Sequence, residues 1–410
     1  MTIFTLLLLL EPALATDYVD GDYGGDDLEL VDGDTLGGVL TNLGTVTIPV
    51  DATVTVTTAT VELYAARVVI DGALSADGAC DPGGLGALPG PLEGDAGIGV
   101  GGGVGGGPGP CMHGGGGGGG GYGGAGGVGG HLDGAEPGWG VGGAAHGTNE
   151  LVVQDPGSGG GGGGSACSWA GRSGGAGGGS LYIVADEVMV SGTITSHGAD
   201  GETVDDEDDD GGPGGGGSGG AIVIDTPILG GGGRLSAHGG VGGSAGGRWA
   251  GGGGGGGGGR IVVVGDYRDL SYSTEPGEPG RANHYEPDLW PGAGPGERGS
   301  IDISGGGPPV GLVLDGACPG PVMVTADGMA PGAQWAILQA RGVGDHPMPA
   351  GRCLGTETGL GPEGFAVLVR GLANADGLLE LARPFPERIC NSKLQLIDLS
   401  TCRVSTVERF

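Results

Sequence analysis

Among the residues suited to acid–base chemistry, two histidines stand out by their placement. His197 and His238 lie 41 positions apart, and a glycine follows each of them. Histidine suits proton transfer because its pKa lies near neutral pH. These two occupy equivalent places in a repeat described below, which favours a structural explanation. A Ser/His/Asp group cannot be assembled from the sequence alone, so we predict no catalytic residue.

A run of six adjacent acids is the best candidate for metal binding. Carboxylate oxygens suit calcium, but six neighbours in the chain cannot all turn toward one ion. We therefore expect a solubility and spacing role, with weak calcium binding as the alternative and no other cofactor. The run consists of Asp205, Asp206, Glu207, Asp208, Asp209 and Asp210.

Seven cysteines follow a segment that looks like a secretory signal, so disulfides are the expected chemistry. A zinc site is disfavoured because no C-x-x-C spacing occurs. One group lies near the C-terminus and could form two bridges in any of three connectivities. The other group is odd in number, so one member is free or pairs outside it. The two groups are Cys318, Cys353, Cys390 and Cys402, and Cys80, Cys111 and Cys167.

The elements that would carry these residues are copies of one repeat. Residues 181–198 align without gaps on 222–239 after a shift of 41, and on 61–78 after a shift of 120. Apolar residues alternate within each copy and the alternation breaks twice, which predicts three short strands and two bends. Stacked copies would bury a continuous core. We predict an all-β, parallel β-helix-like solenoid over 44–264; a flat sheet of a sandwich is the alternative.

Long glycine-rich segments separate the repeats, at 79–179 and roughly at 199–220 and 240–259. Glycine supplies 110 of 410 residues. It shows no G-X-Y period along the chain, which excludes collagen. Two states are open. Polyglycine is a flexible coil when free in water, but adjacent tracts could pack as extended polyglycine II helices with three residues per turn. Tracts that leave one corner of the solenoid together favour the packed state.

The N-terminal region contains two segments that we expect outside the solenoid. Residues 1–15 carry an apolar stretch and the small-x-small sequence Ala13-Leu14-Ala15, which predict a signal peptide. Residues 16–43 are rich in acids, glycine and tyrosine. This composition predicts an acidic, disordered leader.

Two further segments follow the solenoid. Residues 265–309 are rich in proline and glycine, so we predict a linker in which Tyr285 and Trp290 plug the open end of the solenoid. Residues 310–410 contain seven apolar runs separated by turn residues, which predict a disulfide-containing β-sandwich.

The net charge of −33 bounds the choice of partners. A chain this acidic repels phosphate backbones, so we expect no nucleic acid. No apolar run is long enough for a transmembrane segment. The predicted signal peptide and the lack of a long apolar run together predict a secreted protein or one on the outer cell surface.

Two parts resemble known families. The cycle of apolar run, small residue and glycine tract in 178–264 resembles the glycine-rich β-solenoid surface proteins of bacteria. The second resemblance is to a Cys-containing β-sandwich module of secreted proteins from myxobacteria. Its residues are Cys318-Pro319-Gly320, Ala326–Gly332, Gly351–Gly355 and Leu396–Cys402. The resemblances imply a surface or secreted protein and no particular reaction.

Three functions remain to be compared. The first is a non-enzymatic structural or adhesive protein, with glycans or other cell-surface components as partners. The second is a polysaccharide lyase or hydrolase on a β-helix, but the aligned outward positions form no row of acids. The third is an ice- or surface-binding solenoid, which would need a ladder of threonines, and Thr45, Thr47, Thr53, Thr55 and Thr57 supply only one rung of it. The outward positions compared are Glu62, Tyr182, Val223, Val69, Met189 and Gly230. We expect the first.

Overall fold

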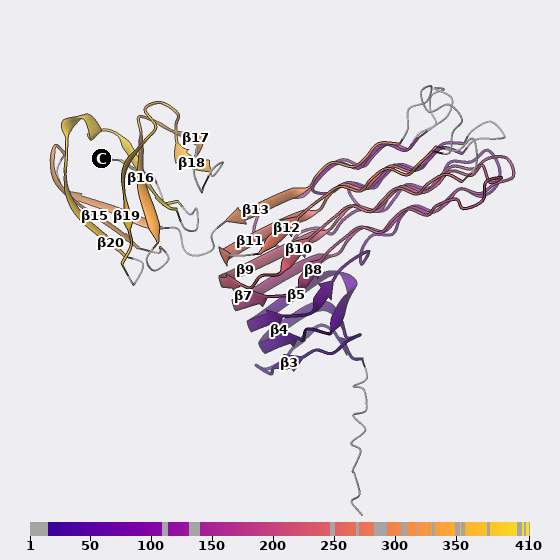
Figure 1. The fold of residues 1–410 in the computed structure, drawn as a ribbon, viewed down its shortest axis with the longest axis horizontal. Helices are drawn as coiled ribbons and strands as arrows, with labels where there is room; N and C mark the ends of the chain where they lie inside the picture. Colours follow the sequence, from indigo (N-terminus) through magenta and orange to yellow (C-terminus); the bar gives the residue numbers. More distant parts are fainter. Residues whose placement is uncertain are drawn as a thin grey trace, which may run out of the picture. The chain divides into compact units, whose positions relative to one another are not determined.

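The structure is a computed structural model that describes most of the chain. The described residues are 15–108, 114–130, 140–246, 251–267, 270–282, 293–304, 310–316, 318–327, 329, 333–348, 353, 357–374, 378–399, 404, 405 and 407–409. The predicted signal peptide therefore lies outside them, apart from Ala15. The described fold is all-β, with a single 3-10 turn at Glu387–Ile389 (Figure 1).

A large parallel sheet of thirteen strands organises the first part of the chain. Its path runs β12-β10-β8-β6-β5-β7-β9-β11-β13, and β4 pairs with β5 and with β1 to β3. The strands are β1 (Asp17–Tyr18), β2 (Gly21–Asp22), β3 (Leu28–Glu29), β4 (Thr35–Ile48), β5 (Thr53–Ile70), β6 (Ala73–Ser75), β7 (Ser180–Val190), β8 (Thr193–Thr195), β9 (Ala221–Gly230), β10 (Arg234–Ser236), β11 (Arg260–Tyr267), β12 (Ser271–Ser273) and β13 (Ser300–Ser304).

The register of the sheet follows the sequence repeat. Val68 pairs with Val188, which is the predicted shift of 120. Arg234 pairs with Thr193, which is the predicted shift of 41. The apolar members of each copy are buried, as their alternation predicts. The repeat in the sequence is therefore a repeat of parallel strands.

The prediction of a disordered leader over residues 16–43 is wrong, because these residues supply β1 to β3 and the first part of β4. Their acids bind backbone rather than only water. The buried Asp34 carboxylate accepts the N–H groups of Thr16 and Val31 at 2.7 and 2.8 Å. Charge-assisted bonds of this kind offset the cost of ordering a polar chain. Asp20, Asp27 and Asp32 accept backbone N–H groups in the same way.

The predicted linker over residues 265–309 is also partly incorrect. It contains the end of β11, all of β12 and β13, and glycine-containing tracts that run beside others. Tyr285 and Trp290, predicted to plug the solenoid, lie outside the described residues.

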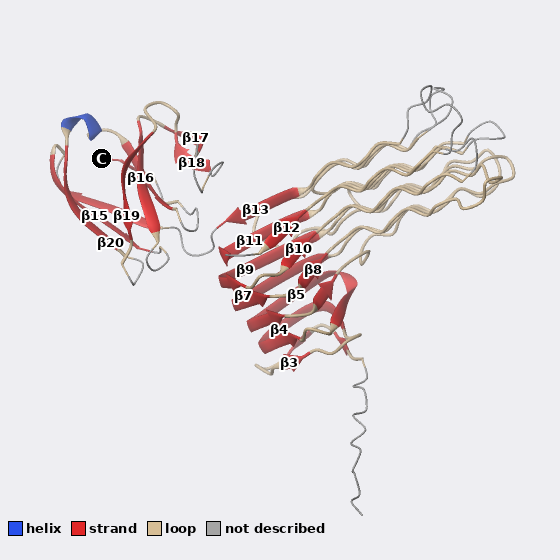
Figure 2. Cartoon of the chain, in the orientation of Figure 1, coloured by secondary structure: helices blue, strands red, loops and turns tan. Residues whose placement is uncertain are grey.

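The glycine-rich segments extend away from the parallel sheet as long runs without strand assignment (Figures 1 and 2). Their backbone bonds in three directions with a period of three. In the run 114–122, Gly116 and Gly119 donate to the tract 124–130, Gly117 and Gly120 to the tract 211–220, and Gly118 and Gly121 to the tract 101–107. The carbonyls of the same run accept from three further tracts, 140–147, 157–164 and 251–259. A period of three means that each tract turns once in three residues.

Some tracts are enclosed on all sides by others. Where a tract is enclosed, a Cβ at almost any glycine would lie about 2 Å from a neighbouring carbonyl oxygen, as Gly119 would from Gly255 O at 2.0 Å. Only glycine allows this approach. The enclosed tracts are 114–122, 157–164, 211–220 and 251–259, and the tracts around them are 82–88, 92–98, 101–107, 124–130, 140–147, 171–179, 198–204, 237–246, 274–281 and 293–299.

The C-terminal region forms a unit made mainly of residues 303–410. A three-stranded sheet has the order β14-β15-β20, and a four-stranded sheet has the order β19-β16-β21-β22. A buried cluster holds Val322 and Val324 of the first sheet together with Trp335 and Leu396 of the second. The strands are β14 (Gly311–Gly316), β15 (Gly320–Asp327), β16 (Gln334–Ala340), β17 (Val343–Pro347), β18 (Glu357–Leu360), β19 (Ala366–Leu372), β20 (Leu379–Phe385), β21 (Lys393–Asp398) and β22 (Glu408–Arg409).

This arrangement fits the predicted sandwich. Six of the seven predicted runs overlap strands, and the seventh, 404–407, contributes bridges at Val404 and Ser405. The hairpin of β17 and β18 was missed, because its sequence lacks a continuous apolar run.

Candidate functional site

The two predicted histidines are brought together by the parallel pairing of β8 and β10. Their rings stack with centroids 4.7 Å apart and an interplanar angle of 17°. His197 Nε2 lies 2.8 Å from Ser236 Oγ, and His238 Nε2 lies 2.8 Å from Ser273 Oγ. Asp77 Oδ1 lies 3.7 Å from His197 Nδ1. Ser236, His197 and Asp77 therefore lie close together in the fold, although their proximity could not be predicted from the sequence.

This group does not have the geometry of a nucleophilic triad. Ser236 is 3% exposed, so its hydroxyl is closed to a substrate. The distance of 3.7 Å exceeds that of the hydrogen bond by which a carboxylate orients histidine. Asp77 Oδ1 instead accepts the backbone N–H of His197 at 2.6 Å. The repetition at His238 and Ser273 agrees with the structural explanation that the sequence favoured.

The surroundings of both rings oppose protonation. Burial lowers the pKa of His197, with Arg234 acting in the same direction and Asp77 against it. Burial also lowers the pKa of His238, reinforced by His197 and Arg234 and opposed by Glu275 and Asp77. Both imidazoles are therefore neutral at pH 7 and bind serine hydroxyls as neutral rings.

A second group of polar residues, which sequence reasoning missed, lies where the glycine tracts meet β11. Arg260 donates from Nε and Nη2 to His146 O and from Nη1 to Asn149 Oδ1 at 2.6 Å. The Tyr122 ring is fully buried, 5.0 Å from the His146 ring and 5.6 Å from the Arg260 guanidinium carbon. Burial raises the pKa of Tyr122. A fully buried phenol cannot exchange protons with a substrate. The contacts of Arg260 instead join the start of β11 to the segment that holds His146 and Asn149.

The acidic run does not form one site. Residues 205–208 are exposed, whereas Asp209 is buried and pairs with Arg172 at 2.6 Å. Asp209 Oδ1 also accepts the N–H of Gly211 at 2.8 Å. Across the described ranges, no three His, Cys, Asp or Glu side chains are grouped so that they could hold a metal ion. Asp209 thus closes the turn before an enclosed tract, and weak calcium binding stays a prediction for titration.

Among the cysteines that the structure describes, one is a free thiol and the others are disulfide-bonded. Cys318 and Cys390 form a disulfide with Cα atoms 5.5 Å apart, which selects among the connectivities left open by the sequence. Cys167 and Cys353 each take part in a further disulfide. Cys80 is free, and burial raises the pKa of its thiol to about 12, so the thiolate is scarce at neutral pH. Cys111 and Cys402 lie outside the described residues.

Of the positions compared for an enzyme, Glu62 and Tyr182 carry local contacts, and Val223, expected to face outward, is buried. Glu62 accepts a 2.8 Å hydrogen bond from the Tyr64 hydroxyl, and the rings of Tyr64 and Tyr182 meet edge to face at 6.1 Å. Arg67 pairs with Glu187 on the neighbouring strand at 2.9 Å. These contacts link β5 to β7, and the aligned row carries a single carboxylate, Glu62.

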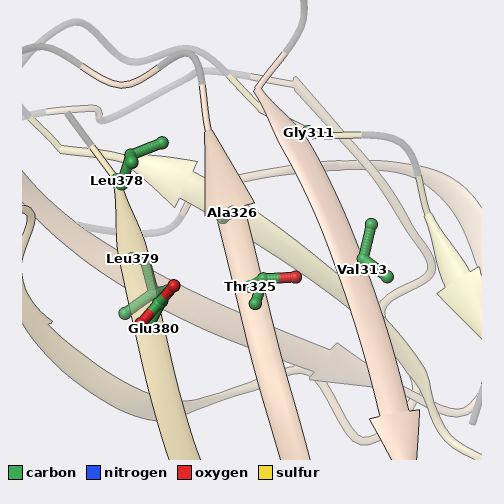
Figure 3. Close-up of a pocket in the computed structure, with 7 residues that line it drawn as sticks. All are labelled: Gly311, Val313, Thr325, Ala326, Leu378, Leu379 and Glu380. Atoms are coloured by element: carbon green, nitrogen blue, oxygen red, sulfur yellow. The ribbon is translucent and has the colours of Figure 1, made fainter. Parts of the chain in front are cut away.

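A small depression lies over β14, β15 and β20 in the C-terminal unit (Figure 3). Its volume is about 150 Å³. The lining is mostly apolar and carries a single ionisable group, Glu380. The lining residues are Gly311, Val313, Thr325, Ala326, Leu378, Leu379 and Glu380. Glu380 has no second ionisable side chain beside it in this lining, so the depression offers no acid–base pair.

In the described part of the chain, no helix is long and apolar enough to cross a membrane. A scan against protein-family models finds no match, and searches of the curated proteins and of the solved structures find none either.

Proposed function

We propose that this chain is a non-enzymatic structural or adhesive protein, secreted or held on the cell surface. In this proposal a parallel β-solenoid is the wall, and a polyglycine II bundle extends from it. The observation that carries the proposal is the backbone network of the enclosed tracts, in which glycines bond to several neighbouring tracts. Cα–H groups approach carbonyl oxygens closely in such a lattice and add weak contacts.

The composition of this network supports a scaffold rather than a catalyst. Ordering glycine costs more backbone entropy than ordering any other residue. In this proposal, the product of ordering so much glycine is a rigid bundle of tracts. The described residues of catalytic type serve that shape: Asp77 and Asp209 accept backbone N–H groups, and Arg260 holds a backbone carbonyl.

An adhesive role is supported by a turn at the end of two tracts. The tract 157–164 and the tract 171–179, which leads into β7, are joined by residues 165–170, so this turn lies at the end away from β7. Trp169 in this turn is 36% exposed. Arg172 and Asp209 lie beside it, because Ala170 O accepts a bond from Arg172 Nη1. An exposed aromatic beside fixed polar groups suits the apolar face and hydroxyls of a sugar.

The experiment is a binding screen of the secreted protein against glycans and intact cells, with and without calcium. We expect binding that Trp169→Ala weakens by at least about tenfold, or ~1.4 kcal/mol. The control is Val241→Ala, which truncates an exposed side chain along a tract. Equal binding by both variants would remove Trp169 from the proposal. Depolymerisation of any polysaccharide in the screen would replace the proposal with the enzymatic alternative.

A further inference from the structure

The stacked histidines lie where two neighbouring strands end and the chain enters the glycine tracts. His197 follows β8 and precedes the tract 198–204, and His238 follows β10 and lies in the tract 237–246. The register of β8 and β10 places them at the same point along the two strands. Any change in their charge therefore acts at the junction of sheet and tracts.

The backbone of both histidines belongs to that junction. His197 O accepts the N–H of Gly78 at 2.8 Å, and His238 O accepts the N–H of Gly198 at 2.9 Å. The neighbouring Ser196 carbonyl accepts the N–H of Gly220 at 2.9 Å. These bonds tie three successive passages of the chain together within two residues of the rings.

The charged groups around the pair are unevenly placed. Asp77, after β6, is the acid nearest His197. Arg234, on β10, has Nη2 3.4 Å from His238 Nε2. Glu275, after β12, is paired with Arg298 at 2.7 Å, so it is partly neutralised. One added proton could rest on His197 beside Asp77, but a second would face both the first and Arg234.

We propose that His197 and His238 form an acid-sensitive latch that closes the junction of sheet and tracts when both rings are neutral and loosens it when they are protonated. Two imidazolium rings 4.7 Å apart repel each other. The His238 ring would also lose the ability to accept a hydrogen bond on either nitrogen. Separation of the ends of β8 and β10 relieves this repulsion, and it breaks the bond between Gly198 N–H and His238 O that joins them.

The direction of the pKa shifts agrees with this latch. Burial lowers both histidine pKa values in the folded chain below the ordinary value of 6.5. The unfolded or locally opened chain then binds more protons than the closed chain at pH values just below 6.5. Stability rises with pH wherever the open state binds more protons. The contribution of the latch is thus complete above pH 6.5 and is lost as the pH falls through the folded pKa values.

Hydrogen exchange on the full chain between pH 5 and 7.5 tests the proposal. After correction for intrinsic exchange, peptides that contain Gly198, whose N–H bonds to His238 O, should open more as the pH falls. The opening equilibrium should change by up to about tenfold per pH unit for each proton taken up. Peptides from the enclosed tract 251–259 serve as the internal control and should keep their protection.

The test variant is the double change His197→Gln with His238→Gln, and the matched control is His346→Gln in the C-terminal unit. Glutamine keeps a polar group near the Nε2 position without a titrating charge. We expect the double variant to lose the pH dependence and the control to retain it. If the double variant does not fold, ring titration in the wild-type chain decides. Imidazole signals of His197 and His238 that titrate at or above 6.5 would overturn the latch, as would an unchanged pH slope in the double variant.

Discussion

At the residue scale, an enclosed glycine differs from a glycine in a turn. A Cβ on Gly119 would lie 2.0 Å from Gly255 O and 2.5 Å from its carbonyl carbon. Both are backbone atoms, held by bonds to further tracts, so they cannot turn aside as a side chain would. Gly232, between β9 and β10, has no atom within 4 Å of the same position.

We therefore predict that Gly119→Ala destabilises the chain by about 1–3 kcal/mol or more, as overpacking does in a dense core. Gly232→Ala should change stability little. The measurement is the midpoint of denaturant unfolding for the two variants. A midpoint for Gly119→Ala equal to that of Gly232→Ala would mean that the tracts separate easily and do not form a packed lattice.

At the element scale, the number of glycines per three-residue turn follows the number of neighbouring tracts. The run 251–259 is all glycine and has neighbours on every side. The tract 239–246 bonds to four others and keeps glycine at about two positions of three; the tract 275–281 bonds to three others and keeps one, at Gly277 and Gly280. Side chains are therefore commoner where a turn of the tract faces outward, although the enclosed tracts also hold a few buried ones, such as Ser158, Ser218 and Tyr122.

This pattern means that shortening a tract should affect stability differently from shortening a free loop. A free loop loses little stability when shortened, because closure entropy depends weakly on length. Deleting three glycines from 251–259 would instead draw Arg248, Trp249 and Ala250 toward positions that admit only glycine. We predict that this deletion lowers the thermal midpoint of the chain strongly, whereas inserting three glycines at the same place, which brings no side chain into the tract, does not. Thermal melts of the two variants decide, and equal midpoints would restore the loop interpretation.

Much of the sheet could be predicted from the sequence, because Val68, Val188 and their equivalents repeat at fixed spacing and burial follows their alternation. Two features could not. The leader orders because acids such as Asp34 meet N–H groups 18 residues away, which composition cannot reveal. The sequence alone did not decide between flexible and packed glycine tracts. Within single tracts, however, glycine recurs at every third position, as at Gly198 and Gly201, and this local spacing favours the packed state. The meeting of Asp77, His197 and Ser236 required the strand register.

At the scale of the whole molecule, the tracts form a folded region with little apolar interior. Their contacts are backbone to backbone, so unfolding them exposes mainly peptide groups. Apolar exposure raises the heat capacity, and polar exposure lowers it. We predict a heat-capacity change per residue clearly below the usual ~12–15 cal/mol/K. Calorimetry on the intact chain measures it, and a value within the usual range would mean that apolar burial in the sheet dominates.

The three-directional bonding of the tracts also has a mechanical consequence. In a two-dimensional sheet, force across the strands meets hydrogen bonds in one plane only, and the sheet bends easily out of that plane. Around the run 114–122, bonds radiate to partners on every side. A sideways load on any one tract is therefore shared by all the tracts that are hydrogen-bonded to it. We expect the bundle to resist bending equally in every direction, which is the property of a spike or a spacer.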